Sequence, residues 1–186
     1  MRLLICVVVP AFVVGCANPS VKPNFVLDAN GAKALVIVSV TRPDREVFFT
    51  SPVCSYRSIG GSVSGTIGKS RVPRLDEDRI ESTSATHLGM PSVMGKLAAL
   101  ELPAGEYEFF HCSVRNAFGS YSTIRPMSLR FRVAPGELVY IGNILVAPES
   151  IPFVSVSNNA DRDLSLAKDR WPKVPVFESR QRLLAF

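Results

Sequence analysis

Histidine is scarce in this sequence, whose 186 residues include only His87 and His111. A hydrolytic triad needs a histidine beside a serine or cysteine nucleophile and an acid. The local sequence around neither histidine supports such a triad, and His111 lies in a run that predicts a strand, where we expect a packed, hydrogen-bonded ring. The sequence therefore predicts that the chain is not an enzyme, and hydrolysis by Ser/His or Cys/His chemistry is the least favoured function.

Recognisable motifs for zinc or phosphate are also missing. Suitable zinc ligands lie far apart in the sequence, at His87, His111, Cys54 and Cys112. No C-x-x-C or H-x-x-x-H spacing links them. The stretch 65–70 partly resembles a phosphate-binding loop, but Val63 stands where that loop needs a glycine. We therefore expect no metal and no cofactor.

Residues 159–163 match the start of a calcium-binding loop, but the residues that follow do not match the rest of it. Leu164 and Arg170 stand where the calcium loop needs glycine and glutamate. The same residues fit the start of a helix, because acids in a first turn interact favourably with the helix dipole. The acidic run 76–78 is expected to be a solvated loop.

Basic residues are not concentrated in any one part of the chain. Lysine and arginine number 21 against 16 acidic residues, for a formal net charge of +5. Nucleic-acid-binding proteins cluster their basic residues on one face. Because the basic residues here are scattered, we expect no nucleic-acid partner.

No apolar run is long enough to span a bilayer, which takes about 20 residues. The apolar run 3–14 follows Met1 and Arg2, and it predicts a secretory signal peptide over residues 1–15. The residues Val13-Val14-Gly15-Cys16 then resemble the lipobox of bacterial lipoproteins. An ordinary signal peptide that contains a cysteine, or a short uncleaved anchor, is the alternative.

The lipobox resemblance implies that Cys16 becomes the acylated first residue of the mature chain. Each methylene of an acyl chain such as palmitate contributes about 0.8 kcal/mol of binding free energy when it is buried in the membrane. Several acyl chains therefore anchor a protein stably to a membrane. In the sorting rule that the resemblance implies, an Asp after the cysteine retains the protein in the inner membrane. Because Ala17 follows here, we expect attachment to the outer membrane, facing the periplasm.

Two cysteines remain after Cys16, namely Cys54 and Cys112. Disulfides persist in the exported compartment, so a bridge between them is one interpretation. It would close a loop of 59 residues, which the chain-entropy estimate values at about 4 kcal/mol. Two separate buried thiols are the other interpretation.

The mature chain is predicted to be a lipidated tether over 16–24 and one β domain over 25–186. Strand patterns recur at 34–41, 46–50 with 54–57, 62–67, 96–102, 106–114, 128–133, 137–146 and 153–157. Residues 58–92 are rich in glycine and charge, and are expected to be mainly long irregular loops. About seven short strands with Pro/Gly turns predict a mainly β fold, an antiparallel β-sandwich.

Two turns and one helix complete this prediction. Glycine-containing turns at 103–105 and 134–136 predict that the strands on either side of each turn come back on one another as hairpins. A short helix is expected over 160–170, with a cap from Asn158 or Asn159 and a stop at Pro172. Its apolar side carries Leu164, Ala167 and Trp171.

The stretches 102–109 and 131–143 resemble turn-and-strand signatures of uncharacterised bacterial lipoproteins with a transthyretin-like or carboxypeptidase-regulatory-like β-sandwich domain. The resemblance implies a fold and no chemistry. Gly105 and Gly136 would permit the turns, and Tyr107 and Tyr140 would pack on the strands that follow.

The function favoured by this sequence is a lipid-anchored envelope protein with a non-catalytic role, either structural or in binding a protein partner in the envelope. The alternative is a periplasmic module that binds a glycan or another small molecule. In that case Tyr56, Tyr121 or Phe118 would supply an aromatic stacking platform.

Overall fold

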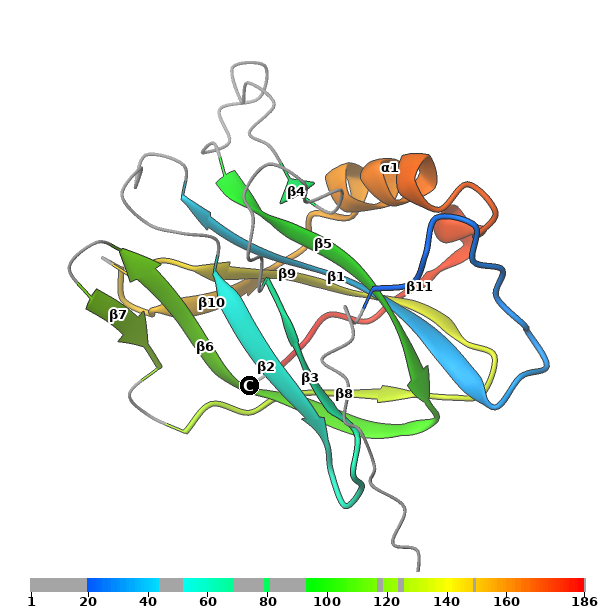
Figure 1. The fold of residues 1–186 in the computed structure, drawn as a ribbon, viewed down its shortest axis with the longest axis horizontal. Helices are drawn as coiled ribbons and strands as arrows, with labels where there is room; N and C mark the ends of the chain where they lie inside the picture. Colours follow the sequence, from blue (N-terminus) through cyan, green and yellow to red (C-terminus); the bar gives the residue numbers. More distant parts are fainter. Residues whose placement is uncertain are drawn as a thin grey trace, which may run out of the picture.

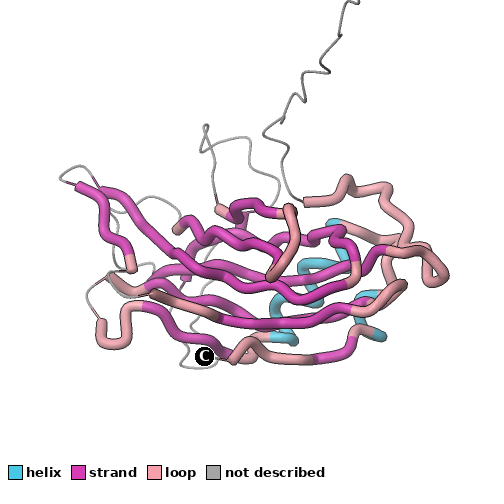
Figure 2. The backbone as a smooth tube through the Cα atoms, turned by 90° about the horizontal axis from the view of Figure 1, so that it is seen from below, coloured by secondary structure: helices cyan, strands magenta, loops and turns pink. Residues whose placement is uncertain are grey.

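The computed structural model describes residues 20–43, 52–68, 79–80, 93–116, 119–123, 126–148 and 150–185. These residues form two β-sheets that pack as a sandwich, and α1 (Ala160–Arg170) lies outside one of them (Figure 1). Strands make up most of the described backbone in Figure 2. The predicted β-sandwich is therefore confirmed.

Sheet A contains six strands and sheet B contains five. Sheet A runs in the order β10 (Val154–Ser157), β9 (Leu138–Val146), β1 (Lys33–Pro43), β5 (Val93–Pro103) and β4 (Arg79–Ile80), and β11 (Arg180–Gln181) also pairs with β9. Sheet B runs in the order β3 (Ser64–Ile67), β2 (Val53–Ser58), β6 (Gly105–Asn116) and β7 (Gly119–Ser122), and β8 (Leu129–Val133) also pairs with β6. The sequence predicted too few strands, and it missed that β9 pairs in parallel with both β1 and β11.

The central strand of sheet A, β1, is buried on both faces. From Ala34 to Arg42 every residue of β1 is buried. Val36 and Val38 face sheet B in the central core, whereas Leu35 and Ile37 face the helix side, where Leu164 and other residues of α1 cover them. The prediction that 34–41 is covered on both faces is confirmed, and such two-sided burial explains the nearly continuous apolar run.

Sheet B has one buried and one solvated face. Leu129, Phe131 and Val133 point into the core, while Arg130 and Arg132 are exposed. This alternation was predicted, because successive side chains of a strand point to opposite faces. Tyr107 stacks on Phe131 with ring centroids 5.4 Å apart, so Tyr107 packs on the sheet as expected.

Neither predicted hairpin forms. β5 pairs with β1 and β4, whereas β6 pairs with β2, β7 and β8, so the chain crosses from sheet A to sheet B at Ala104. The turn at 134–136 makes the reverse crossing, from β8 to β9. Gly136 has a φ of +68°, and a side chain there would collide with the backbone carbonyl of Ala29, which accounts for the glycine.

The chain joins the fold earlier than the predicted tether of 16–24 allows. Ser20 forms a bridge with Leu100 at the outer edge of β5. Val21 donates its N–H to the carbonyl of Ala99 at 2.8 Å. Ser20 and Val21, which belong to the predicted tether, are therefore hydrogen-bonded to the sandwich.

Several expectations fall on other parts of the chain. The strand expected around 62–67 is confirmed as β3, and 54–57 is confirmed as part of β2. Residues 1–19, with the signal peptide and Cys16, lie outside the described residues, as do 46–50 and most of 69–92.

The C-terminal helix is confirmed with its predicted bounds. Asn159 is the N-cap residue and makes no capping hydrogen bond with its side chain. Oδ1 of the preceding Asn158 accepts the N–H of Ala160 at 3.1 Å. Leu164, Ala167 and Trp171 lie in the core between α1 and sheet A. Within the described part of the chain, no helix has the length and apolar character needed to cross a membrane.

Candidate functional site

Cys54 and Cys112 lie opposite one another on β2 and β6 and form a disulfide. Both residues are fully buried. The bridge is thus confirmed over the alternative of separate thiols. A zinc site that uses these two sulfurs is excluded as long as they are bonded to each other, because thiolate is the form of cysteine that binds metals.

His111 lies on β6, where its side chain has a threonine hydroxyl as a partner. Its Nδ1 is 3.3 Å from Oγ1 of Thr123, and the side chain is partly buried on β6. His87 and the acidic run 76–78 lie outside the described residues. Among the described residues, no group of three or more His, Cys, Asp or Glu side chains is placed to hold a metal ion.

Of the three aromatic residues predicted for a stacking platform, Tyr56 does not lie on the surface. Tyr56 is only 5% exposed and packs edge-on against Phe109, with ring centroids 5.8 Å apart. Tyr121 is 43% exposed on β7, and Phe118 lies outside the described residues. Tyr56 is therefore a core residue and cannot stack on an external ligand.

A buried group of polar side chains lies between sheet A and α1, at the N-terminal end of the helix. Its members are Ser39, Thr41, Tyr140, Asn143, Ser157, Arg162 and Asp163, and we call it the helix-facing polar cluster. Burying a polar side chain without a hydrogen-bond partner costs free energy. The hydrogen bonds within the cluster therefore show whether its polar groups are satisfied by one another.

Asp163 is the centre of the helix-facing polar cluster and is fully buried. Its Oδ2 accepts hydrogen bonds from Oγ of Ser39 at 2.6 Å and from the phenol of Tyr140 at 2.7 Å. Its Oδ1 accepts hydrogen bonds from Nε and Nη2 of Arg162, both at 2.8 Å. The carboxylate charge is therefore compensated by a guanidinium and two hydroxyl donors.

Asn143 joins the cluster because of a bulge in β9. Along β1, Ile37 pairs with Tyr140 but Ser39 pairs with Asn143, so β9 carries one residue more than its partner. Gly142 has a φ of +102°, a backbone conformation that glycine adopts without a steric penalty. The bulge keeps Asn143 on the helix side, where its Oδ1 accepts a hydrogen bond from Oγ1 of Thr41 at 2.8 Å.

The phenol of Tyr140 acts as a fixed donor in the cluster. Burial, together with the adjacent negative charge of Asp163, raises the pKa of Tyr140 far above its usual value. The neutral phenol therefore persists, donating to Asp163 and accepting the N–H of Asn159 at 3.2 Å. These hydrogen bonds hold the first turn of α1 against the sheet. The polar groups of the cluster are thus hydrogen-bonded to one another, which is a structural role.

Sequence reasoning missed this cluster. Ser39 and Thr41 lie within a strand that is otherwise apolar, so they do not mark a site in the sequence. Asp163 is explained equally well by a favourable interaction with the helix dipole. The available signal is the position of Ser39 and Thr41, which alternate with Val38 and Val40 in a strand otherwise covered on both faces. Hydroxyls placed at such buried positions need partners.

The outer face of sheet B carries a second polar arrangement, which we call the charged rung. It runs across β2, β6 and β8, where Glu108 lies opposite both Arg57 and Arg130. Oε1 of Glu108 accepts from Nε and Nη2 of Arg57 at 2.8 and 2.7 Å, and Oε2 accepts from Oγ of Ser128 at 2.6 Å. The guanidinium of Arg57 also lies 4.7 Å from the centre of the Phe110 ring.

Glu108 is held in its ionised form. The hydrogen bonds from Ser128 and from Arg57, followed by the positive charges of Arg57 and Arg130, lower the pKa of Glu108 below its usual value. The charged rung thus presents two arginines to solvent with a glutamate between them. It is suited to electrostatic recognition of a partner surface.

Comparison of the chain with protein-family models, with curated proteins and with solved structures finds no match. The likeness to transthyretin-like domains of bacterial lipoproteins therefore stays a prediction.

Proposed function

We propose that this chain is a lipid-anchored protein of the cell envelope, in which the β-sandwich has a non-catalytic structural or partner-binding role. The observation that carries the proposal is the order of residues 1–16: a positive start, an apolar run and a lipobox cysteine. In this proposal Cys16 holds the lipid, and the outer membrane, on its periplasmic side, is the expected location.

The disulfide supports export. Bridges such as Cys54–Cys112 form and persist in oxidising compartments and are rare in the cytosol. The helix-facing polar cluster supports a non-catalytic role, because its carboxylate and its hydroxyls are hydrogen-bonded to one another and hold a helix in place.

The two faces of the sandwich differ in a way that favours one side for partner binding. α1 and the chain around Val174 and Val176 pack on the outer face of sheet A. The outer face of sheet B instead presents the charged rung and the exposed Arg132. We propose sheet B as the partner-facing side, because charged groups around an interface give specificity and steer association.

The anchor is tested by the mass of the mature N-terminus. Protein purified from bacterial membranes should begin at Cys16 and carry the mass of a diacylglycerol with an added acyl chain. A Cys16→Ser variant should lose this mass and leave the membrane fraction. A wild-type chain that begins at Met1, or that is soluble and unmodified, would contradict the proposal.

The partner-binding role is tested by photocrosslinking in intact cells. A crosslinking residue at Arg132 on sheet B should give a discrete protein adduct, and the double variant Arg57→Glu/Arg130→Glu should weaken it. The matched control carries the crosslinking residue at position 161 in place of Asp161, which is exposed on α1. This control should give no protein adduct. Turnover of a substrate by the purified domain, with no adduct from either position, would overturn the non-catalytic role.

A further inference from the structure

The N-terminal segment is fixed to the fold very close to the predicted lipid. We propose that residues 20–28, together with the outer edge of β5, face the membrane leaflet that holds the acyl chains. This inference rests on the lipid anchor proposed above, and it adds an orientation for the domain on the bilayer.

Three hydrogen bonds attach the start of this segment to the sandwich. The backbone N–H of Ala99 donates to Oγ of Ser20 at 3.1 Å, and the N–H of Val21 donates to the carbonyl of Ala99 at 2.8 Å. The indole Nε1 of Trp171 donates to the carbonyl of Val21 at 3.0 Å. Trp171 itself is buried, so the segment is held by β5 and by the end of α1.

The remaining chain is short. Four residue steps separate Cys16 from Ser20, and a fully extended chain of that length spans at most about 14 Å. A folded domain of this size has a radius of gyration of about 15 Å, so its width is more than twice that reach. Ser20 must therefore stay near the headgroups, and the opposite side of the domain must point away from them.

The side chains of the segment divide between the fold and the outside. Phe25 and Leu27 pack against the core under α1. Lys22 is exposed, and Val26 is 62% exposed. The ammonium group of Lys22 suits the phosphates of an anionic leaflet. The carboxylate of Asp28, which is also exposed, opposes this attraction. The apolar Val26 side chain is compatible with the same interfacial environment.

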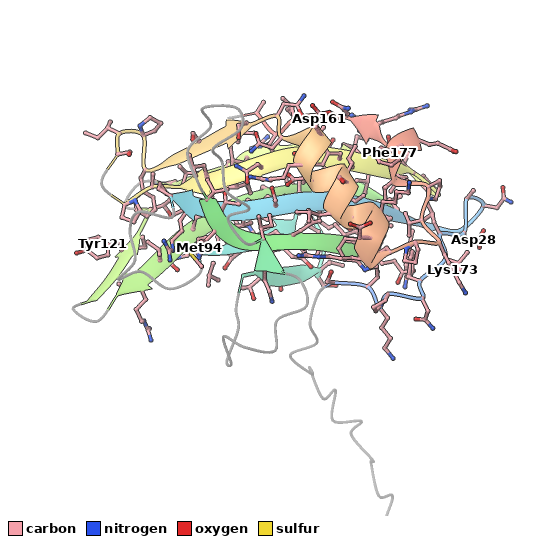
Figure 3. The ribbon with its side chains drawn as sticks, turned by 90° about the horizontal axis from the view of Figure 1, so that it is seen from above. Asp28, Met94, Tyr121, Asp161, Lys173 and Phe177 are labelled. Atoms are coloured by element: carbon pink, nitrogen blue, oxygen red, sulfur yellow. A yellow bond between two sulfur atoms is a disulfide. The ribbon has the colours of Figure 1, made fainter. Side chains whose placement is uncertain are left out.

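The opposite edge of sheet A supplies a reference point. β9 pairs with β10 and β11, and it is separated from β5 by β1. Phe177 lies just before β11, in the short helix η2 (Val176–Glu178), and its 63% exposed fraction nearly equals that of Val26. In the view of Figure 3, Phe177 is seen on the side of Asp161, and Asp28, at the end of the N-terminal segment, is seen away from both.

The orientation is tested with a fluorescent label at each of these two positions. In the mature chain the native cysteines are acylated, at Cys16, or joined in the buried disulfide, so Val26→Cys or Phe177→Cys adds the one reactive thiol. The acylated full-length protein is labelled and placed in vesicles of equal parts phosphatidylethanolamine and phosphatidylglycerol that contain nitroxide-labelled lipid. We expect quenching at position 26 to be several times that at position 177.

Two outcomes separate the orientation from the anchor. If mass analysis confirms the acyl chains but both labels are quenched equally, or position 177 more strongly, the orientation is wrong and the anchor stands. If the chain is not acylated, the proposed function itself fails.

A spacer variant tests the cause of the orientation. A Gly/Ser linker of about twelve residues placed between Pro19 and Ser20 lets the domain move away from the lipid. We expect quenching at position 26 to fall toward that at position 177. Unchanged quenching would overturn the short reach as the reason for the orientation.

Discussion

At the scale of single residues, Asp163 illustrates how one buried charge determines the position of a helix. The carboxylate is fully buried and accepts hydrogen bonds from Ser39, Tyr140 and Arg162. Removing one member of such a group leaves the others buried without their partner, which costs more than the net gain of the intact group.

We therefore expect Asp163→Asn to lower the free energy of unfolding by about 2–4 kcal/mol. Urea denaturation measures this change. Asp161→Asn is the matched control, because Asp161 lies in the same helical turn but is exposed, and it should change stability by less than about 0.5 kcal/mol. Equal effects of the two substitutions would contradict the structural role of the cluster.

Glu108 predicts a pH dependence at the same scale. Its pKa is lowered in the folded state by Ser128 and Arg57, so the folded protein binds this proton more weakly than the unfolded chain does. The stability from Glu108 is therefore present above the unfolded pKa of about 4.3 and is lost as the pH falls through the lower folded pKa.

Glu108→Gln should reduce the free energy of unfolding at pH 7 by about 1–2 kcal/mol and should flatten its fall between about pH 5 and pH 2. Urea denaturation at a series of pH values tests both effects. Glu106, two residues earlier on the same face of β6 and exposed, provides the control variant Glu106→Gln. A Glu108→Gln profile that parallels the wild type would show that the charged rung does not stabilise the fold.

At the scale of elements, the sequence located strands better than it assigned their partners. Residues 106–114 were predicted to pair with 96–102, and the glycine turn between them supported that pairing. A short turn fixes the local bend, but it does not decide whether the chain returns along its own sheet or crosses to the other.

Burial patterns carry the information that the turns lack. The stretches 34–41, 96–102 and 138–146 are apolar at most positions, and all three lie in sheet A, between sheet B and the helix side. The stretch 129–133 alternates and lies in sheet B, which has a solvated face. Comparing these patterns across each turn would have predicted both crossings.

The polar cluster could not be predicted in the same way, because its members come from separate elements. Ser39 and Asp163 are 124 residues apart in the sequence. The place of Tyr140 and Asn143 in the cluster depends on the parallel pairing of β1 with β9 and on the bulge at Gly142. Neither feature has a local signature beyond the glycine itself.

The bulge leads to a prediction for β9. Gly142→Ala places a side chain at a φ of +102° and within 3.1 Å of Cδ2 of Leu183. We expect a loss of about 1–3 kcal/mol in the free energy of unfolding. Thermal denaturation checks this loss. Gly119→Ala in β7 is the control, because a Cβ there meets nothing within 4 Å. A comparable loss at both positions would show that the positive φ of Gly142 is not the cause of the loss.

At the scale of the whole molecule, the two sheets are stabilised in different ways. Sheet A is covered on its outer face by α1 and by the N-terminal segment, whose Phe25 and Leu27 pack against the core there. Sheet B has a solvated face, and its two strands β2 and β6 are joined by the Cys54–Cys112 disulfide. The covalent bond therefore reinforces the sheet that buries less apolar surface.

We expect the double variant Cys54→Ala/Cys112→Ala to lose about 4 kcal/mol, the value that chain entropy gives for a closed loop of 59 residues. The disulfide is buried, so a reductant reaches it only after unfolding. Wild-type protein that is unfolded and refolded in dithiothreitol should therefore match the variant in urea denaturation, and the variant itself should be unaffected by dithiothreitol. Wild-type protein that keeps its full stability after verified reduction would show that packing around β2 and β6 suffices without the bridge.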